Sequence, residues 1–145
     1  MSRRAAALIA CLALLVPAAA AVAKDPAELP PLAADLRTCR EDGPGARTAT
    51  WAASMPRGSR GGRLALKFVL LERTPPEARD HRVPVASAER WVRSDPGVAG
   101  LVHERRVRAL RDPSAYRMEV RFRWYDARGR LERTAVRHSR ACAPA

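Results

Sequence analysis

Aromatic residues and lysine are both scarce in this chain of 145 residues. Phe, Trp and Tyr make up only 5% of the sequence, so any hydrophobic core must rest mainly on aliphatic side chains. Lysine supplies 2 of the 27 basic residues and arginine the other 25, and with 15 acidic residues the formal net charge is +12. The length fits one domain, which excludes a large multi-domain enzyme and a polytopic membrane protein.

Motifs for catalysis or cofactor binding are absent. The three histidines (His81, His103 and His138) are far apart, and no H-E-x-x-H or C-x-x-C spacing occurs, so zinc and iron sites lack their usual ligand pattern. There is also no G-x-S-x-G elbow, P-loop or G-x-G-x-x-G. We therefore expect no catalytic residue, metal or cofactor. The alternative is a small hydrolase. Its only candidate acid–base pair is Asp80 and His81, which are neighbours in a Pro-rich loop.

The first 23 residues have the pattern of a secretory signal peptide. Arg3 and Arg4 precede an apolar stretch, Pro17 interrupts it, and Ala-Val-Ala at 21–23 offers a small-x-small cleavage site. We expect cleavage after Ala23 and an extracytoplasmic protein. Residues 24–34, with three prolines, are then an N-terminal linker, and residues 35–145 the folded domain.

Two other interpretations of the N-terminus stay open. Leu8–Cys11 fits a lipoprotein cleavage box with Cys11 as the lipidated residue, although only about six apolar residues precede it, fewer than the usual 7–15. An uncleaved membrane anchor would need residues 5–23 to span the bilayer despite Pro17. After signal cleavage we expect no stable membrane span.

Only Cys39 and Cys142 remain once the signal peptide is removed. Two thiols in an oxidising compartment permit one intramolecular pairing, so the sequence predicts a Cys39–Cys142 disulfide. Because C-x-x-C spacing is lacking, we interpret it as a structural bond between the first and last strands rather than a redox-active pair.

Period-two alternation predicts strands along most of the domain. The clearest one covers residues 116–125, where apolar residues alternate with Arg117, Glu119, Arg121, Arg123 and Tyr125. Residues 126–129 form a hairpin turn into a closing strand over 131–142. Alternation also predicts strands over 47–55, 63–73 and 89–94 and, with a less regular pattern, over 101–110. Residues 74–85, rich in Pro and charge, are expected to be a long connection. About seven strands and no convincing helix predict an all-β fold: one antiparallel β-sandwich, closed by a single disulfide.

One local pattern resembles the tyrosine corner of immunoglobulin-like and fibronectin type III domains. Tyr116 opens the penultimate strand six residues after Leu110, across an Asp112-Pro113 turn. The chain is also similar to small secreted immunoglobulin-like domains of high-GC bacteria. The resemblance covers about residues 36–142 and implies a tyrosine hydroxyl bonded to the preceding backbone. The chain departs from antibody domains in lacking, at the usual spacing, an inter-sheet cysteine pair with a Trp between them.

The arginine excess is the one candidate for a functional surface. Three arginines and Tyr125 share the outer face of strand 116–125, and the closing strand is expected to add two more (Arg117, Arg121, Arg123, Arg133 and Arg137). Such a face suits anionic polymers. A GC-rich coding bias would also place many arginines on exposed strands, without any role in binding. We therefore expect a non-catalytic domain with a binding or structural role at the cell envelope, its partner an envelope polymer or another envelope protein. The alternative is an extracellular polyanion binder for cell-wall polymer, lipid headgroup or, least favoured, nucleic acid.

Overall fold

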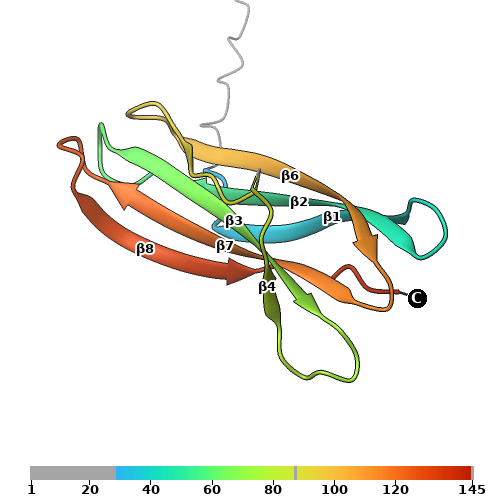
Figure 1. The fold of residues 1–145 in the computed structure, drawn as a ribbon. Coiled ribbons are helices and arrows are strands. Elements are labelled where there is room, and N and C mark those ends of the chain that lie inside the picture. The colour runs from blue at the N-terminus through green and yellow to red at the C-terminus, as the bar shows by residue number, and fades with distance from the viewer. Residues whose placement is uncertain (1–28, 87, 145) are drawn as a thin grey trace, which may run out of the picture.

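The computed structural model describes residues 29–86 and 88–144, which form two antiparallel β-sheets packed face to face (Figure 1). The first sheet has the order β1-β2-β6, from β1 (Ala33–Glu41), β2 (Ala46–Pro56) and β6 (Gly100–Arg111). The second has the order β4-β3-β7-β8, from β4 (His81–Val83), β3 (Arg63–Arg73), β7 (Ala115–Tyr125) and β8 (Leu131–His138), and β5 (Val92–Arg93) pairs with β3. The predicted all-β sandwich is confirmed. The predicted signal peptide, its cleavage site and Cys11 lie outside the described residues.

The core lies where the inward-facing residues of β2, β3 and β7 meet. Along β7 the even-numbered positions from Tyr116 to Trp124 are at most 5% exposed, as the alternation predicts. They lie opposite the inward residues of β3, because Phe122 pairs with Leu66 and Val120 with Phe68. The largest side chains of this core are Trp51, Met55, Phe68, Phe122 and Trp124.

The Cys39–Cys142 disulfide is confirmed, with Cα atoms 5.5 Å apart. Cys39 lies on β1 in the first sheet. Cys142 is fully buried and its backbone exchanges two hydrogen bonds with Tyr116 of β7, at 2.7 and 2.8 Å. The bond therefore joins the two sheets at one end of the sandwich. It indicates an oxidising, extracytoplasmic environment.

The hairpin turn between β7 and β8 forms as predicted. Gly129 has a φ of 79°, which favours glycine. Asp126 Oδ1 accepts hydrogen bonds from the backbone N–H groups of Arg128 and Arg130 at 2.8 and 2.9 Å. These bonds, with the Arg130 guanidinium, hold the pKa of Asp126 below its ordinary value.

The strands differ from the sequence-based expectation in four places. The segment 74–85 is not entirely a connection, because His81–Val83 pair with β3 as β4; the strand expected over 89–94 is reduced to Val92–Arg93. The closing strand ends at His138 rather than at residue 142. There the Ser139 hydroxyl accepts from the Met118 N–H at 2.9 Å, so a side chain replaces the next strand contact. At the other end β1 begins at Ala33, inside the expected linker.

Within residues 29–86 and 88–144, the structure contains no helix long and apolar enough to cross a membrane.

Candidate functional site

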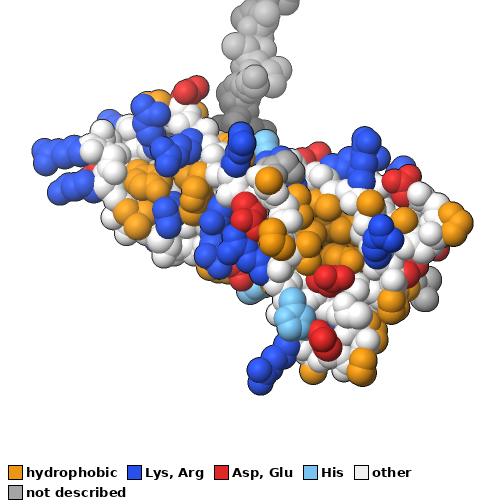
Figure 2. Space-filling model, in the orientation of Figure 1, with side chains coloured by type: hydrophobic (Ala, Val, Ile, Leu, Met, Phe, Trp, Pro, Cys, Tyr) orange, Lys and Arg blue, Asp and Glu red, His pale blue; other side chains and the backbone are white. Residues whose placement is uncertain are grey.

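The candidate surface is the outer face of the larger sheet, the side of β3, β7 and β8 that points away from the core. Pairing between strands places Arg63 beside Tyr125 and Lys67 beside Arg121 on this face. Arg123 and Arg93 lie on either side of Ala65. The structure thus gathers four of the predicted residues, Arg117, Arg121, Arg123 and Tyr125, and adds Arg63, Lys67 and Arg93. Figure 2 shows basic side chains in several groups over the visible surface, with fewer acidic ones between them.

Arg133 and Arg137 do not belong to this face, which corrects the predicted stripe. Arg133 pairs with Trp124 and Arg137 with Val120, residues that point into the core. The Arg133 guanidinium carbon lies 3.8 Å from the centre of the Trp124 ring. The cause is an irregularity after the hairpin turn. Tyr125 pairs with Leu131 but Trp124 pairs with Arg133, so Glu132 is skipped and every later residue of β8 changes face.

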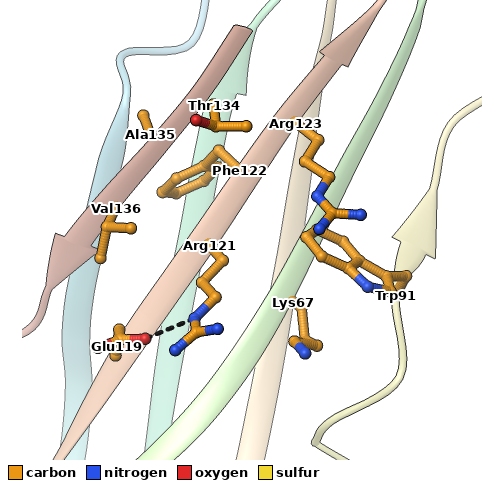
Figure 3. Close-up of a pocket in the computed structure, with 9 residues that line it drawn as sticks. All are labelled: Lys67, Trp91, Glu119, Arg121, Phe122, Arg123, Thr134, Ala135 and Val136. Atoms are coloured by element: carbon orange, nitrogen blue, oxygen red, sulfur yellow. Dashed lines mark hydrogen bonds and ion pairs between the residues drawn. The ribbon is translucent and has the colours of Figure 1, made fainter. Parts of the chain in front are cut away.

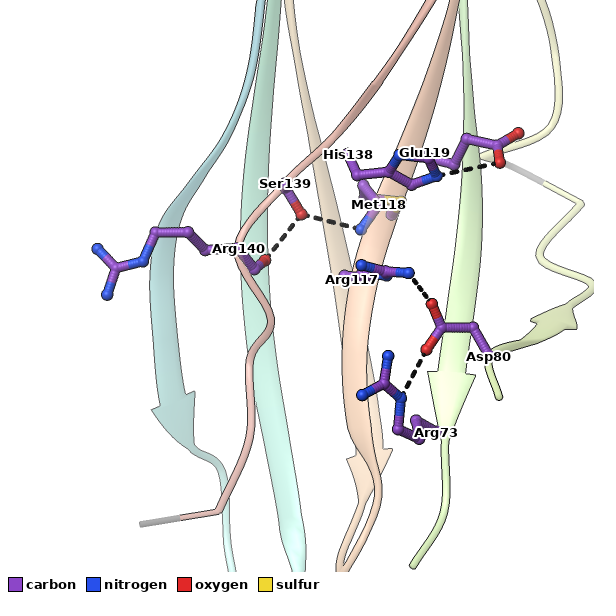
Figure 4. A network of polar contacts seen from close by, with 8 residues as sticks. All are labelled: Arg73, Asp80, Arg117, Met118, Glu119, His138, Ser139 and Arg140. Atoms are coloured by element: carbon purple, nitrogen blue, oxygen red, sulfur yellow. Dashed lines mark hydrogen bonds and ion pairs between the residues drawn. The ribbon is translucent and has the colours of Figure 1, made fainter. Parts of the chain in front are cut away.

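Two of the predicted arginines are held by acidic side chains. Arg117 forms an ion pair with Asp80, which also bonds the Nε of Arg73 at 2.9 Å (Figure 4). Arg121 Nε donates to Glu119 Oε1 at 2.6 Å, and His138 Nε2 lies 3.3 Å from the other carboxylate oxygen. These cations are largely neutralised within the chain.

Both carboxyls respond to these neighbours. Burial alone would raise the pKa of Asp80, but the hydrogen bonds and charges of Arg73 and Arg117 outweigh it and lower the pKa below its ordinary value. Burial would likewise raise the pKa of Glu119, but the hydrogen bonds and charges of Arg121 and His138 outweigh it. The pKa of Glu119 is therefore also lowered. Both groups are therefore ionised at neutral pH.

These lowered pKa values predict a loss of stability in acid. A carboxyl with a folded-state pKa below its unfolded value stabilises the fold above the unfolded pKa, about 4, and that contribution is lost as the pH falls through the folded pKa. We expect the melting temperature to fall steeply below about pH 4 and Asp80→Asn to flatten that fall. Thermal melts from pH 7 to pH 2 measure it, with Asp35→Asn on the other sheet as the control. Identical pH profiles for Asp80→Asn and the unsubstituted chain would contradict the assignment.

Two of the remaining cations, Arg123 and Lys67, lie over a tryptophan that the sequence pattern did not single out. Trp91, just before β5, is half-buried, with the Arg123 guanidinium carbon 4.3 Å and the Lys67 Nζ 5.3 Å from its ring centre (Figure 3). Four cations of this face form no ion pair among the described residues: Arg63, Lys67, Arg93 and Arg123. The charge of Lys67 acts on the Glu89 carboxylate, but Glu89 forms its ion pair with Arg82. Trp91, Lys67 and Arg123 border a hollow of about 310 Å³, whereas Arg63 and Arg93 lie outside its lining. The one available signal was that Trp91 is the only tryptophan outside the strongly alternating strands.

Tyr116 and Leu110 occupy the corner between β6 and β7. Leu110 is buried, and the Tyr116 hydroxyl accepts a hydrogen bond from the backbone N–H of Arg111 at 3.2 Å. The same hydroxyl donates to Glu72 Oε1 at 2.7 Å. Burial, and then the bond to Glu72, raise the pKa of Tyr116.

Removing this hydroxyl tests its contribution to the fold. Tyr116→Phe is expected to lower the free energy of unfolding by about 1 kcal/mol, because the Arg111 N–H and the Glu72 carboxylate lose a partner. Urea denaturation measures the change. Tyr125→Phe, which removes the only other tyrosine hydroxyl in the chain, is the matched control. Equal midpoints for Tyr116→Phe and the unsubstituted chain would refute the contribution.

No group of three or more His, Cys, Asp or Glu side chains within the described residues is placed to hold a metal ion. Comparisons of the chain with models of protein families, with curated proteins and with solved structures found no match.

Proposed function

We propose that this chain is an exported, non-catalytic domain with a binding or structural role at the cell envelope. The observation that carries the proposal is the disulfide that joins the two sheets, since such bonds persist in oxidising compartments. The basic, signal-like N-terminal sequence agrees with export.

The proposed kinship is with immunoglobulin-like and fibronectin type III domains. In immunoglobulin constant-type domains, one sheet contains strands A, B and E and the other C, F and G. The orders β1-β2-β6 and β3-β7-β8 are consistent with that arrangement, with β4 added beside β3. The hydrogen bond from the Arg111 N–H to the Tyr116 hydroxyl also supports it. Sandwiches of this kind carry unrelated functions, so the proposed role rests on compartment and surface.

Expression of the tagged full chain in a bacterial host tests export. We expect an extracytoplasmic protein whose intact mass corresponds to loss of residues 1–23 and formation of one disulfide. A mass increase consistent with acylation of Cys11 would instead identify a lipoprotein. Intracellular accumulation with two free thiols at Cys39 and Cys142 would refute the proposal.

A second proposed function, binding of polyanions, is favoured by four cations that have no acidic partner among residues 29–86 and 88–144. Arg63, Lys67, Arg93 and Arg123 lie on one face, where their charges add to attract an anionic polymer. Arginine also binds carboxylate and phosphate groups through two parallel hydrogen bonds. Arg117 and Arg121 contribute less, because Asp80 and Glu119 already hold them.

Retention on a heparin column tests polyanion binding. We expect the mature domain to be retained at low salt and released as salt rises. Replacing Arg63 and Arg93 together by Gln is expected to shift elution to clearly lower salt. The matched control replaces Arg106 and Arg108 of β6, on the other sheet, by Gln. Absence of retention at low salt, or an equal shift in the control, would contradict a binding face on the larger sheet.

A further inference from the structure

We propose that the hollow beside Trp91 is a subsite for one acidic sugar residue of an anionic polysaccharide, held by stacking on Trp91 and by the side chains of Arg123 and Lys67. This inference rests on the proposed polyanion binding and gives that binding a location and a ligand class.

The first argument is the combination of an aromatic ring with cations. A tryptophan offers a flat apolar surface for the C–H face of a sugar ring, and Trp91 is the half-buried one, while Trp51 and Trp124 are at most 1% exposed. Arg123, lying over the indole, is positioned by that contact and keeps its N–H donors for a carboxylate. The hollow of about 310 Å³ is within the size range of small-ligand sites.

The second argument is the acidic residue at the other end of the same hollow. Glu119 borders the hollow, where Arg121 holds one of its carboxylate oxygens (Figure 3) and His138 lies beside the other (Figure 4). An ionised carboxylate accepts hydrogen bonds from sugar hydroxyls and repels any anionic group, so the charged group of a ligand is expected beside Arg123 and Lys67 and its hydroxyls beside Glu119. Thr134 adds a hydroxyl to the same lining. A ligand that carries both an anionic group and hydroxyls fits this arrangement, whereas a polyphosphate chain carries charge without hydroxyls or a ring.

The surface around the hollow also favours a soluble sugar polymer over a lipid headgroup layer as the ligand. Insertion into a headgroup layer would be favoured by several exposed apolar side chains around the cations. Of the large apolar side chains that are strongly exposed in the described residues, only Val136, 45% exposed, borders this hollow. A single apolar contact beside a recess indicates a soluble polymer as the ligand.

Fluorescence titration of the mature domain tests the subsite, because Trp91 is the tryptophan with access to solvent. The probes are trigalacturonic acid, neutral galactotriose and tripolyphosphate, added at two salt concentrations. We expect trigalacturonic acid to change the fluorescence and to bind at least tenfold more tightly than either other probe. Arg123→Gln and Lys67→Gln are each expected to weaken its binding about tenfold, and Trp91→Ala to remove the signal.

Controls distinguish this subsite from general polyanion binding. Arg106→Gln, on the other sheet, is expected to leave the affinity for trigalacturonic acid unchanged. Circular dichroism shows whether each variant folds; if Trp91→Ala does not, Arg123→Gln and Lys67→Gln decide the test by calorimetry. Equal affinity for tripolyphosphate, or no effect of either variant, would overturn the subsite. Salt-sensitive retention on heparin in that case would leave polyanion binding standing, whereas its loss would remove both.

Discussion

Replacing both Cys39 and Cys142 by alanine is expected to lower the free energy of unfolding by about 4–5 kcal/mol. The two residues are 103 positions apart, so the disulfide constrains nearly the whole described domain in its unfolded state. In the chain-entropy account, a loop of about 100 residues contributes about 4.7 kcal/mol. Because a small domain has a total stability of about 5–15 kcal/mol, the variant is expected to be marginally folded.

Guanidinium denaturation of the oxidised domain, the reduced domain and the double alanine variant measures this effect. Reduction and substitution are expected to give similar losses, since both release the same loop closure. The backbone hydrogen bonds between Cys142 and Tyr116 do not replace the disulfide. They join the C-terminal segment to β7, but they do not connect that segment to β1. A double variant within 1 kcal/mol of the oxidised domain would show that the sandwich closes without the disulfide.

The sequence predicted the fold wherever side-chain alternation was strict. Tyr116 to Trp124 alternate without interruption, and β7 is the strand that both β3 and β8 flank. The turn at Gly129 and the pairing of the two cysteines could also be predicted from the sequence. The turn depends on local residue chemistry, and the pairing depends only on the number of cysteines left after signal cleavage. β4 was missed because three residues in a Pro-rich segment are too few to show a period, and only the neighbouring strand β3 makes them a strand.

The candidate site was only partly predictable, because it depends on register. Alternation along one strand gave the side of Arg117, Arg121 and Arg123 correctly relative to the core. It could not predict which face of the sheet carries Arg133 and Arg137, because that depends on the irregularity at Glu132, which has no partner in the pairing of β8 with β7. Trp91 reaches Arg123 across more than 30 positions of sequence, and no local pattern encodes that contact. Pairing with Asp80 and Glu119, which removes Arg117 and Arg121 from the free cations, is likewise a tertiary property.

A buried arginine gives the second large expected effect. Arg47, near the start of β2, is only 4% exposed, with its guanidinium 2.6 Å from Asp112 and 2.9 Å from the carbonyl oxygen of Ser114. Its Nε is buried and has no hydrogen-bond partner in the described part of the chain. Asp112→Asn would leave this cation with neutral acceptors only, and a buried charge without its counter-charge destabilises a fold by about 3–5 kcal/mol. Because Asp112 is itself 39% exposed and water reaches it, we expect a loss of about 2–3 kcal/mol.

A double-mutant cycle separates the ion pair from the packing of the turn between β6 and β7. Arg47→Met is expected to cost less than Asp112→Asn, since methionine fills much of the same volume and leaves no buried charge. The exposed Asp112 carboxylate stays hydrated, and only the neutral carbonyl of the buried Ser114 loses a donor. Arg47→Met with Asp112→Asn is expected to be more stable than Asp112→Asn alone, because no cation then remains buried. Urea denaturation of the four chains gives the coupling energy. Strictly additive losses would mean that Arg47 acts here through its apolar stem and its bond to Ser114, with the carboxylate of Asp112 contributing little to the corner that also holds Tyr116.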